Sequence, residues 1–258
     1  MKSFFSAGLF VVVCWVGSAQ AGEITVAAAS DLRFALKEAA NQFERQTGIR
    51  AKITLGSSGN FFSQIQNGAP FDAYFSADAR YPQKLEESGQ AVRGSLYRYA
   101  IGRLVLWVPN RAGLPSPRRG LQALLDPAVR TIAIANPKHA PYGRAAVAAL
   151  EAAGVYEAVK DKLVLGENIS QAAQFVESGA ADTGLIALSL AVVPAMQQAG
   201  QYWEIPQGAH PPIEQGVVVL KNGQNREGAE AFVSFLQQRE GREILRRYGF
   251  VLPDVTPP

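Results

Sequence analysis

Apolar residues follow two different spacings in the first third of the chain. Residues 24–29 form a short apolar segment that begins with β-branched positions, and apolar residues then recur at helical spacing up to residue 43. The same order, a short apolar segment followed by a helical pattern, recurs over residues 52–65 and 71–88. Three consecutive strand–helix units predict a parallel, right-handed, doubly wound lobe.

A second series of elements follows residue 100. Residues 101–108 form a mostly apolar run, which predicts one strand buried on both faces. Later strands are predicted at 131–135, 162–165, 183–188 and 215–220, and helices at 144–153, 169–177, 227–237 and 239–247. If the strand at 215–220 returns to the first sheet, the chain crosses between two lobes twice.

These patterns predict an α/β fold of two doubly wound lobes with a ligand cleft between them. We expect residues 22–100 and 217–258 to form the first lobe and residues 101–216 to form the second. The two crossings, near residues 100 and 215, would then act as a hinge.

The first 21 residues have the composition of a secretory signal peptide. Lys2 precedes an apolar run over residues 9–16 that is too short to span a bilayer, and Ala19-Gln20-Ala21 supplies a cleavage pattern. The only cysteine, Cys14, lies in this segment. Lipid attachment at Cys14 is the alternative, although the large Val13 precedes it. We therefore expect cleavage after residue 21 and a periplasmic location.

The charge balance excludes partners that need a strongly charged surface. The chain has 25 Lys and Arg against 22 Asp and Glu, a net charge of +3. This excess provides no field to hold nucleic acid or an anionic membrane. With 48% hydrophobic and 18% charged residues, the composition is typical of a soluble globular chain with a large core.

Two predicted strand-to-helix turns have the chemistry of an anion site. Ser30 and Asp31 follow the first strand, and Gly56-Ser57-Ser58-Gly59-Asn60 follows the second. The start of a helix presents N–H groups without helical partners and the positive end of the helix dipole, and small residues let a ligand approach. Each turn could instead merely cap its own helix. Two such turns at one sheet edge favour a binding crevice.

Catalytic motifs are absent from the sequence. His139 and His210, the only histidines, have no metal-ligand spacing, and residues 56–59 lack the G-x-S-x-G pattern of hydrolases. We expect His139 to be a solvated loop residue, and Asp72 and Asp78 to have polar roles at strand ends. A secreted hydrolase is the alternative from another functional class.

Five short segments occur in an order that is typical of one protein family. They are Ala27-Ala28-Ala29-Ser30, Gly56-Ser57-Ser58, Gly68-Ala69-Pro70-Phe71-Asp72 with Ser76-Ala77-Asp78, the segment at 136–143, and Arg247-Tyr248-Gly249-Phe250. Together they resemble the periplasmic molybdate-binding proteins of ABC transporters, over almost the whole chain after residue 21. The resemblance implies a type II periplasmic-binding fold and a monomeric receptor, not an enzyme, that captures molybdate and tungstate for a membrane permease.

The resemblance also implies which residues hold the ion. Ser30 and Ser58 would donate through their hydroxyl and backbone N–H groups, and Tyr142 and Ile169 through backbone N–H groups. The metal would be bound as its oxyanion, with no direct protein–metal ligand and no cofactor. Moving even one charge from water into a protein interior costs on the order of 20 kcal/mol in an idealised estimate. One hydrogen bond to a charged group returns only roughly 1.5–3 kcal/mol, so many donors are needed.

Asp31 is the position at which this chain departs from the family pattern. Some members contribute a tyrosine hydroxyl from the position that aligns with Ala187, and others a polar side chain directly after the first-turn serine, which here is Asp31. An ionised carboxylate would repel a dianion, so we expect the Asp31 side chain to cap its own helix. If it turns inward, an ion that carries a proton, such as hydrogen phosphate, becomes the alternative. Sulfate would be separated from molybdate by cavity size.

Overall fold

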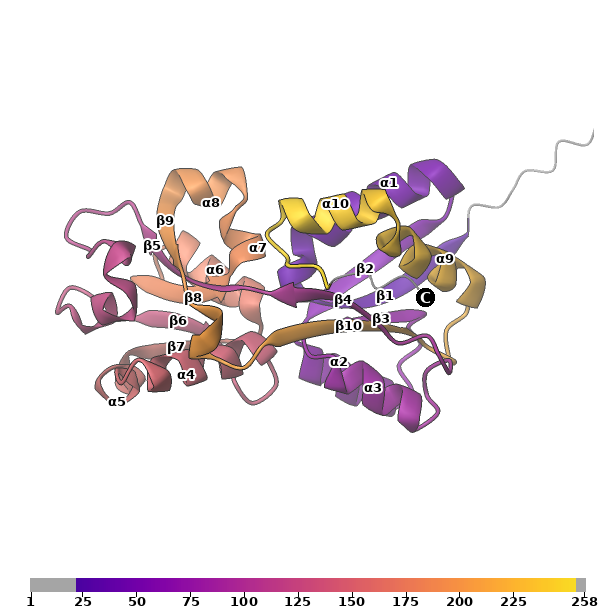
Figure 1. Ribbon diagram of the computed structural model, residues 1–258, viewed down its shortest axis with the longest axis horizontal. Coiled ribbons are helices and arrows are strands. Elements are labelled where there is room, and N and C mark those ends of the chain that lie inside the picture. Colours follow the sequence, from indigo (N-terminus) through magenta and orange to yellow (C-terminus); the bar gives the residue numbers. More distant parts are fainter. Residues whose placement is uncertain (1–21, 254–258) are drawn as a thin grey trace, which may run out of the picture.

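Each of the two lobes is built on a five-stranded sheet (Figure 1). The structure is a computed structural model that describes residues 22–253. The strand order is β2-β1-β3-β10-β4 in the first sheet and β7-β6-β8-β5-β9 in the second. None of the helices within residues 22–253 has the length and apolar character to cross a membrane. The predicted signal peptide, residues 1–21, lies outside the described residues.

The first lobe carries helices on both faces of its sheet. Its strands are β1 (Glu23–Ala29), β2 (Arg50–Gly56), β3 (Ala73–Ser76), β4 (Tyr97–Gly102) and β10 (Ile213–Val219). Its helices are the 3-10 turn η1 (Ser30–Leu32), α1 (Arg33–Thr47), α2 (Ser58–Gln66), α3 (Arg80–Glu87), α9 (Arg226–Gln237) and α10 (Arg239–Arg247). Helices α1, α9 and α10 cover one face, and α2 and α3 cover the other (Figure 1).

The second lobe repeats this arrangement with shorter helices. Its strands are β5 (Leu104–Pro109), β6 (Ile132–Ala135), β7 (Leu163–Gly166), β8 (Thr183–Ala187) and β9 (Gly200–Glu204). Its helices are α4 (Pro141–Ala152), α5 (Tyr156–Val159), α6 (Ile169–Glu177), α7 (Leu188–Ala191) and α8 (Pro194–Ala199), with 3-10 segments η2 (Pro117–Leu125), η3 (Lys160–Lys162) and η4 (Gln207–Ala209). The sequence patterns did not predict β9, α7 or α8.

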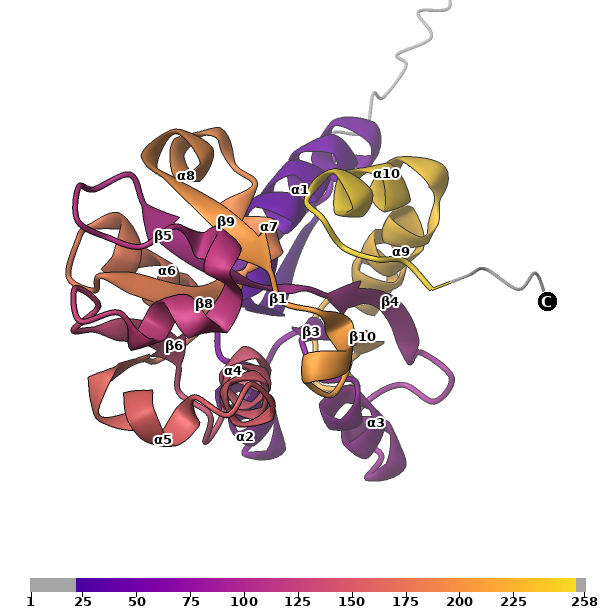
Figure 2. The same ribbon diagram turned by 60° about the vertical axis from the view of Figure 1, so that its left-hand side comes forward.

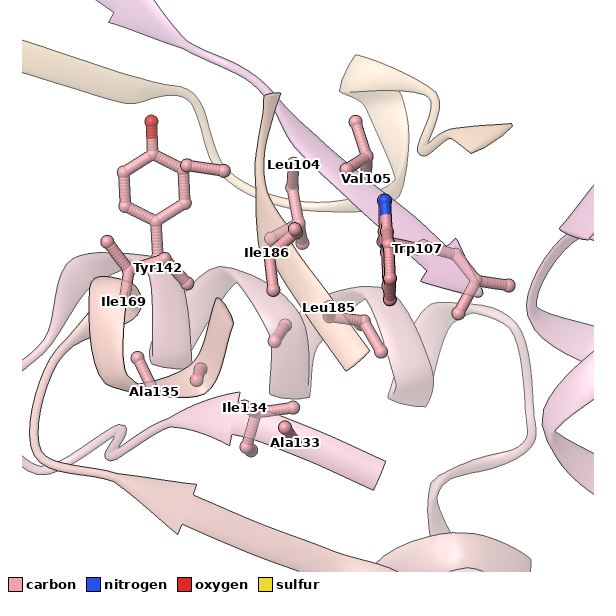
Figure 3. Packing of buried hydrophobic residues seen from close by; sticks show 14 of the residues in the cluster. Leu104, Val105, Trp107, Ala133, Ile134, Ala135, Tyr142, Ile169, Leu185 and Ile186 are labelled. Carbon is pink, nitrogen blue, oxygen red and sulfur yellow. The ribbon is translucent and has the colours of Figure 1, made fainter. Parts of the chain in front are cut away.

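The core residues follow the apolar spacing of the sequence. In the first lobe, the ring of Phe43 from α1 lies 5.1 Å from that of Phe232 from α9. In the second lobe, Trp107 of β5 is fully buried within a cluster that also contains Tyr142 and Ile169. Figure 3 shows Tyr142 and Ile169 at one end of this cluster and Trp107 at the other. Burying a large apolar side chain stabilises a fold by roughly 1.5–3 kcal/mol, so each lobe has its own stable core.

One strand in each sheet runs antiparallel to its neighbours, so the parallel arrangement predicted for the three strand–helix units is confirmed for those units but does not extend over the whole sheet. Strand β10 is antiparallel to β3 and β4, and β5 is antiparallel to β8 and β9. The pairs among β1, β2 and β3, and among β6, β7 and β8, are parallel. The physical reason is the connectivity: β5 and β10 enter their sheets from the other lobe and do not follow a strand–helix crossover within the same sheet.

The apolar run at 101–108 is divided between the lobes, so the prediction of one strand is wrong. Strand β4 ends at Gly102 and β5 begins at Leu104, so Arg103 alone forms the first of the two connections between the sheets (Figure 1). Both parts of the run are apolar because each is buried in its own sheet. The chain returns through residues 205–212, and β10 then pairs in the first sheet from Ile213 onward. Residues 101–102 and 213–216, placed by sequence in the second lobe, therefore pair in the first sheet.

Candidate functional site

A small cavity lies where the two lobes meet. It is lined by Ala29, Ser30, Asp31, Gly56, Ser57, Ser58, Ala77, Ala140, Pro141, Tyr142, Asn168 and Ile169. The space open to the centre of a water-sized sphere is about 10 Å³, close to the room for one water molecule. The structure thus brings together all five residues singled out by sequence: Ser30, Asp31, Ser58, Tyr142 and Ile169.

Four helical segments begin at this cavity, two from each lobe. The first lobe contributes the starts of η1 and α2, and the second contributes the starts of α4 and α6. In Figure 2, α4 of the second lobe is seen in front of α2 of the first, and the Gly59 N–H of α2 donates to the carbonyl of His139, just before α4 (2.9 Å). The first N–H group of each segment, at Ser30, Ser58, Tyr142 and Ile169, has no acceptor within its own helix and can face an anion, whereas other first-turn N–H groups are already paired, such as that of Gly59 with the His139 carbonyl. Tyr142 lies in the first turn of α4, not in the loop before it as predicted.

Ser58 is held in place through its acceptor atoms, which leaves its hydroxyl proton available. Its Oγ accepts a hydrogen bond from the Ala77 N–H (3.0 Å), and its carbonyl oxygen accepts one from the Tyr74 hydroxyl (2.7 Å). The residue is 1% exposed. Because the Ala77 N–H uses only one lone pair of Oγ, the hydroxyl of Ser58 can donate to an ion in the cavity.

Ser30 connects the first lobe to α6 of the second. Its hydroxyl donates to Asn168 Oδ1 (3.0 Å), and the Ser170 hydroxyl donates to the Ser30 carbonyl (2.8 Å). Asn168 also caps α6 by accepting the Gln171 N–H (3.1 Å). The sequence analysis did not single out Asn168, although an asparagine directly before a helical pattern is an N-cap signal.

The Asp31 side chain points toward the second lobe, so the prediction that it caps its own helix is wrong. Neither η1 nor α1 has a side-chain cap. Instead, Asp31 Oδ2 accepts hydrogen bonds from Gln215 Nε2 (2.6 Å) and from the Tyr142 hydroxyl (3.1 Å). Burial raises the pKa of the Asp31 carboxyl to about 6, although hydrogen bonds from Gln215, Tyr142 and nearby backbone N–H groups oppose this shift.

Gln215 is a site residue that the sequence analysis missed. The pairing of β10 with β4 shifts register between Gln215 and Gly216, and such irregularities re-aim side chains. Gln215 is fully buried, and its Oε1 accepts a hydrogen bond from the Tyr99 hydroxyl (2.7 Å). A Cβ at Gly102 would collide with the Tyr142 hydroxyl, so a glycine is required there. The sequence contained one signal for Gln215: it is the polar first residue of the predicted strand at 215–220, whose other residues are glycine and apolar residues.

His139 contacts the other lobe, which corrects its prediction as a solvated loop residue. The Ser57 hydroxyl donates to the His139 carbonyl (2.7 Å) and lies 2.8 Å from its Nδ1. The Gly59 N–H donates to the same carbonyl (2.9 Å). This contact has no local sequence signal, because it forms only when the lobes meet.

Asp78 has the polar structural role predicted for it. It pairs with Arg80 and, across the lobe boundary, with Arg144 (2.7 Å each). Although burial opposes the shift, hydrogen bonds and charge from Arg80, together with the charge of Arg144, hold the pKa of Asp78 below its usual value. Its carboxylate is therefore one half of an ion pair that joins the closed lobes.

Comparison with known proteins agrees with this geometry. The family model for bacterial extracellular solute-binding proteins matches residues 24–251. The molybdate-binding protein ModA of Azotobacter vinelandii is 40% identical over 252 residues, covering 96% of this chain and 99% of that protein. ModA of Rhodobacter capsulatus is 41% identical over 233 residues, 90% of each chain.

A solved structure shows the same fold over most of the chain. The periplasmic molybdate-binding protein of Azotobacter vinelandii aligns with a TM-score of 0.84 and 36% sequence identity, and the match covers 90% of this chain and 100% of that one. Both structures therefore share the two-lobed architecture. Since the family match runs from β1 to residue 251, beyond the last helix α10, the chain belongs to the bacterial extracellular solute-binding proteins.

Proposed function

We propose that this protein is the periplasmic receptor of an ABC transporter and that it captures molybdate, and tungstate with it, between its lobes. The observation that carries the proposal is the convergence of four helix starts, two from each lobe, and the free hydroxyl proton of Ser58 on one small cavity. Members of its family bind solutes, so the protein is a binding protein and not an enzyme. The names of its relatives support molybdate as the ion.

The donor set of the cavity suits a fully deprotonated tetrahedral ion. Within residues 22–253, no Lys, Arg or His lines the cavity. The ion would be held by backbone N–H groups and hydroxyls, each hydrogen bond to a charged group returning roughly 1.5–3 kcal/mol. Neutral donors in a fixed arrangement select by size and by the number of acceptor oxygens, which permits discrimination between ions of equal charge.

Ion binding and lobe closure are one process in this proposal. Donors from the second lobe, at Tyr142 and Ile169, reach the cavity only when the lobes meet, so the ion binds the closed form better and shifts the population toward it. Arg103 and the segment 205–212 are the connections about which the lobes would turn. The membrane permease would then receive the ion from the closed form.

One observation favours hydrogen phosphate as a second candidate. The Asp31 carboxyl lies at the cavity, and an ionised carboxylate could accept the proton that hydrogen phosphate carries. Molybdate and tungstate lack such a proton and need donors only. A direct comparison of ligands distinguishes the two ions.

Titration calorimetry with molybdate, tungstate, sulfate and phosphate tests the proposed function. We expect molybdate and tungstate to bind with one ion per chain, and sulfate and phosphate to bind at least about tenfold more weakly, a difference of about 1.4 kcal/mol. An affinity for sulfate or phosphate equal to that for molybdate would contradict the assignment.

A Ser58→Ala variant tests the contribution of one donor. We expect it to weaken molybdate binding by about 10- to 150-fold, because one hydrogen bond to a charged group is worth roughly 1.5–3 kcal/mol. Ser63 lies on the same helix and is exposed, so Ser63→Ala is the matched control. Equal calorimetric affinities of the two variants would exclude Ser58 from the site.

A further inference from the structure

One side-chain oxygen at the cavity has no hydrogen-bond partner. Asp31 lines the cavity and is 1% exposed, and its Oδ1 is buried without a donor. The other oxygen, Oδ2, already accepts two hydrogen bonds, from Gln215 and Tyr142. A buried polar atom without a partner costs free energy, so an unpaired oxygen beside a ligand cavity indicates a contact that the ligand completes.

No cation contacts the Asp31 side chain within residues 22–253, so only hydrogen bonds from Gln215, Tyr142 and the backbone N–H groups of Asp31 and Leu32 favour its charged form. Tyr142 from α4 and Gln215 from β10 contact its side chain, Tyr99 from β4 lies behind Gln215, and the Ser189 hydroxyl of α7 donates to its carbonyl (2.7 Å). None of these partners, in the part of the chain that the structure describes, is a cation. Burial and the charge of Asp31 raise the pKa of Tyr99 and Tyr142 well above the usual value, so both phenols stay neutral.

The hydrogen bonds of Asp31 determine where a proton would sit. Both contacts at Oδ2 are made by donors, the Gln215 amide at 2.6 Å and the Tyr142 hydroxyl at 3.1 Å. A proton on Oδ2 would compete with these donors, whereas a proton on Oδ1 meets none. The neutral acid is therefore protonated on Oδ1, and its O–H is the only donor that this carboxyl offers to the cavity.

We propose that Asp31 binds the oxyanion as a neutral carboxylic acid, whose Oδ1–H donates to the ion, so that each fully deprotonated molybdate is captured together with one proton from the solvent. The inference rests on the proposed function. The charges balance as follows: ionised Asp31 takes up one proton from the solvent and becomes a neutral acid, and the ion keeps its double negative charge. No covalent bond to the ion forms. The repulsion between two anions that the sequence suggested is thereby removed.

The proton linkage has a definite sign. With the lobes together, burial raises the pKa of Asp31 to about 6 against the opposing effect of its hydrogen bonds, and a dianion next to the carboxyl raises it further. In closed lobes without the ion, the binding-competent acid is therefore the main form below about pH 6, and its fraction falls tenfold for each pH unit above that. The affinity for a fully deprotonated ion should fall as pH rises. Hydrogen phosphate, which brings its own proton, would bind ionised Asp31 without proton uptake.

Calorimetry in two buffers with different ionisation enthalpies measures the proton uptake. At about pH 8, we expect the wild type to take up close to one proton per molybdate and Asp31→Asn to take up none, because the asparagine amide is a permanent donor. Between about pH 7 and 9, wild-type affinity should fall by as much as about 100-fold and that of Asp31→Asn by less than about threefold. Asp161 is exposed and lies in η3, so Asp161→Asn is a control that should behave like the wild type.

Infrared difference spectroscopy on the wild type provides a test that does not depend on the fold of a variant. Adding molybdate should produce the carbonyl-stretch band of a protonated carboxylic acid, and folded Asp31→Asn should lack that band. Molybdate binding without proton uptake, uptake that persists in Asp31→Asn, or absence of the band would overturn this inference and leave the proposed function intact. Failure of the wild type to bind molybdate at all would overturn the proposed function itself.

Discussion

Replacing Gly59 with valine is expected to lower the affinity for molybdate by about 10²- to 10⁴-fold while the unliganded protein stays folded. Gly59 lies in the first turn of α2, and a Cβ at this position would lie 2.8 Å from the carbonyl oxygen of His139 and 3.0 Å from its Cα. These are backbone atoms of the other lobe, which cannot give way as the end of a flexible side chain can. The substitution would therefore hold the lobes apart.

The size of this effect follows from the donors that closure brings to the ion. With the lobes apart, N–H groups at Tyr142 and Ile169 no longer reach an ion held by the first lobe. Two lost hydrogen bonds to a charged group, at roughly 1.5–3 kcal/mol each, amount to about 3–6 kcal/mol, or 10²- to 10⁴-fold in affinity. The three nearest atoms to the added Cβ all belong to His139, so the open first lobe accommodates the new side chain.

Calorimetry and small-angle scattering together check this prediction. Molybdate should reduce the radius of gyration of the wild type and leave that of Gly59→Val unchanged. Gly208 is exposed, and a Cβ there would meet nothing within 4 Å, which makes Gly208→Val the matched control. If Gly59→Val binds molybdate as tightly as Gly208→Val, the lobes do not close through this contact.

Replacing Asp72 with alanine should reduce the free energy of unfolding by about 2–6 kcal/mol without a direct effect on the site. Asp72 is 2% exposed, and its carboxylate accepts the N–H of Thr25 (2.6 Å), the N–H of Asn225 (2.7 Å) and the Thr25 hydroxyl (2.8 Å). The variant leaves two N–H groups without their acceptor, at about 1–3 kcal/mol each. These bonds join β1 to the segment that precedes α9.

Urea unfolding of the ion-free protein measures this loss. An exposed carboxylate such as Asp161 should tolerate the same change, with Asp161→Ala within about 0.5 kcal/mol of the wild type. Below its own melting temperature, Asp72→Ala should still bind molybdate with wild-type affinity, because Asp72 lies outside the cavity lining. If Asp72→Ala has the same free energy of unfolding as Asp161→Ala, the three hydrogen bonds of Asp72 make no net contribution to stability.

Sequence patterns predicted the ends of helices correctly where interactions between neighbouring residues determine them. Helices α6 (Ile169–Glu177) and α10 (Arg239–Arg247) begin and end at the predicted residues. In α6 the reason is visible: Asn168 caps the start, and Gly179 adopts a left-handed φ of 79° just after the end. The proximity of Ser30 and Ser58 was likewise predictable, because strand ends of one parallel sheet share an edge, whereas Tyr142 and Ile169, from the second sheet, were predicted from the family resemblance.

Contacts between distant segments could not be predicted in this way. Asp31 meets Tyr142 and Gln215, which lie 111 and 184 positions further along the chain. No periodicity or capping rule reports on partners at that separation, so the inward orientation of Asp31 was unpredictable. The division of the apolar run at 101–108 was hidden for a related reason: a strand buried in one lobe continues into a strand buried in the other after a single residue, Arg103.

The position of β10 has a consequence for the order in which the protein is made. This strand lies between β3 and β4 in the first sheet, yet all of β5 to β9 precede it in the chain. The second lobe is one uninterrupted segment, so all of its strands have been synthesised before β10 exists. Pairing between distant segments is slow because loop closure costs entropy before any contact forms. The amino-terminal lobe should therefore mature last, and a chain truncated before residue 213 would hold a finished second lobe beside an incomplete first one.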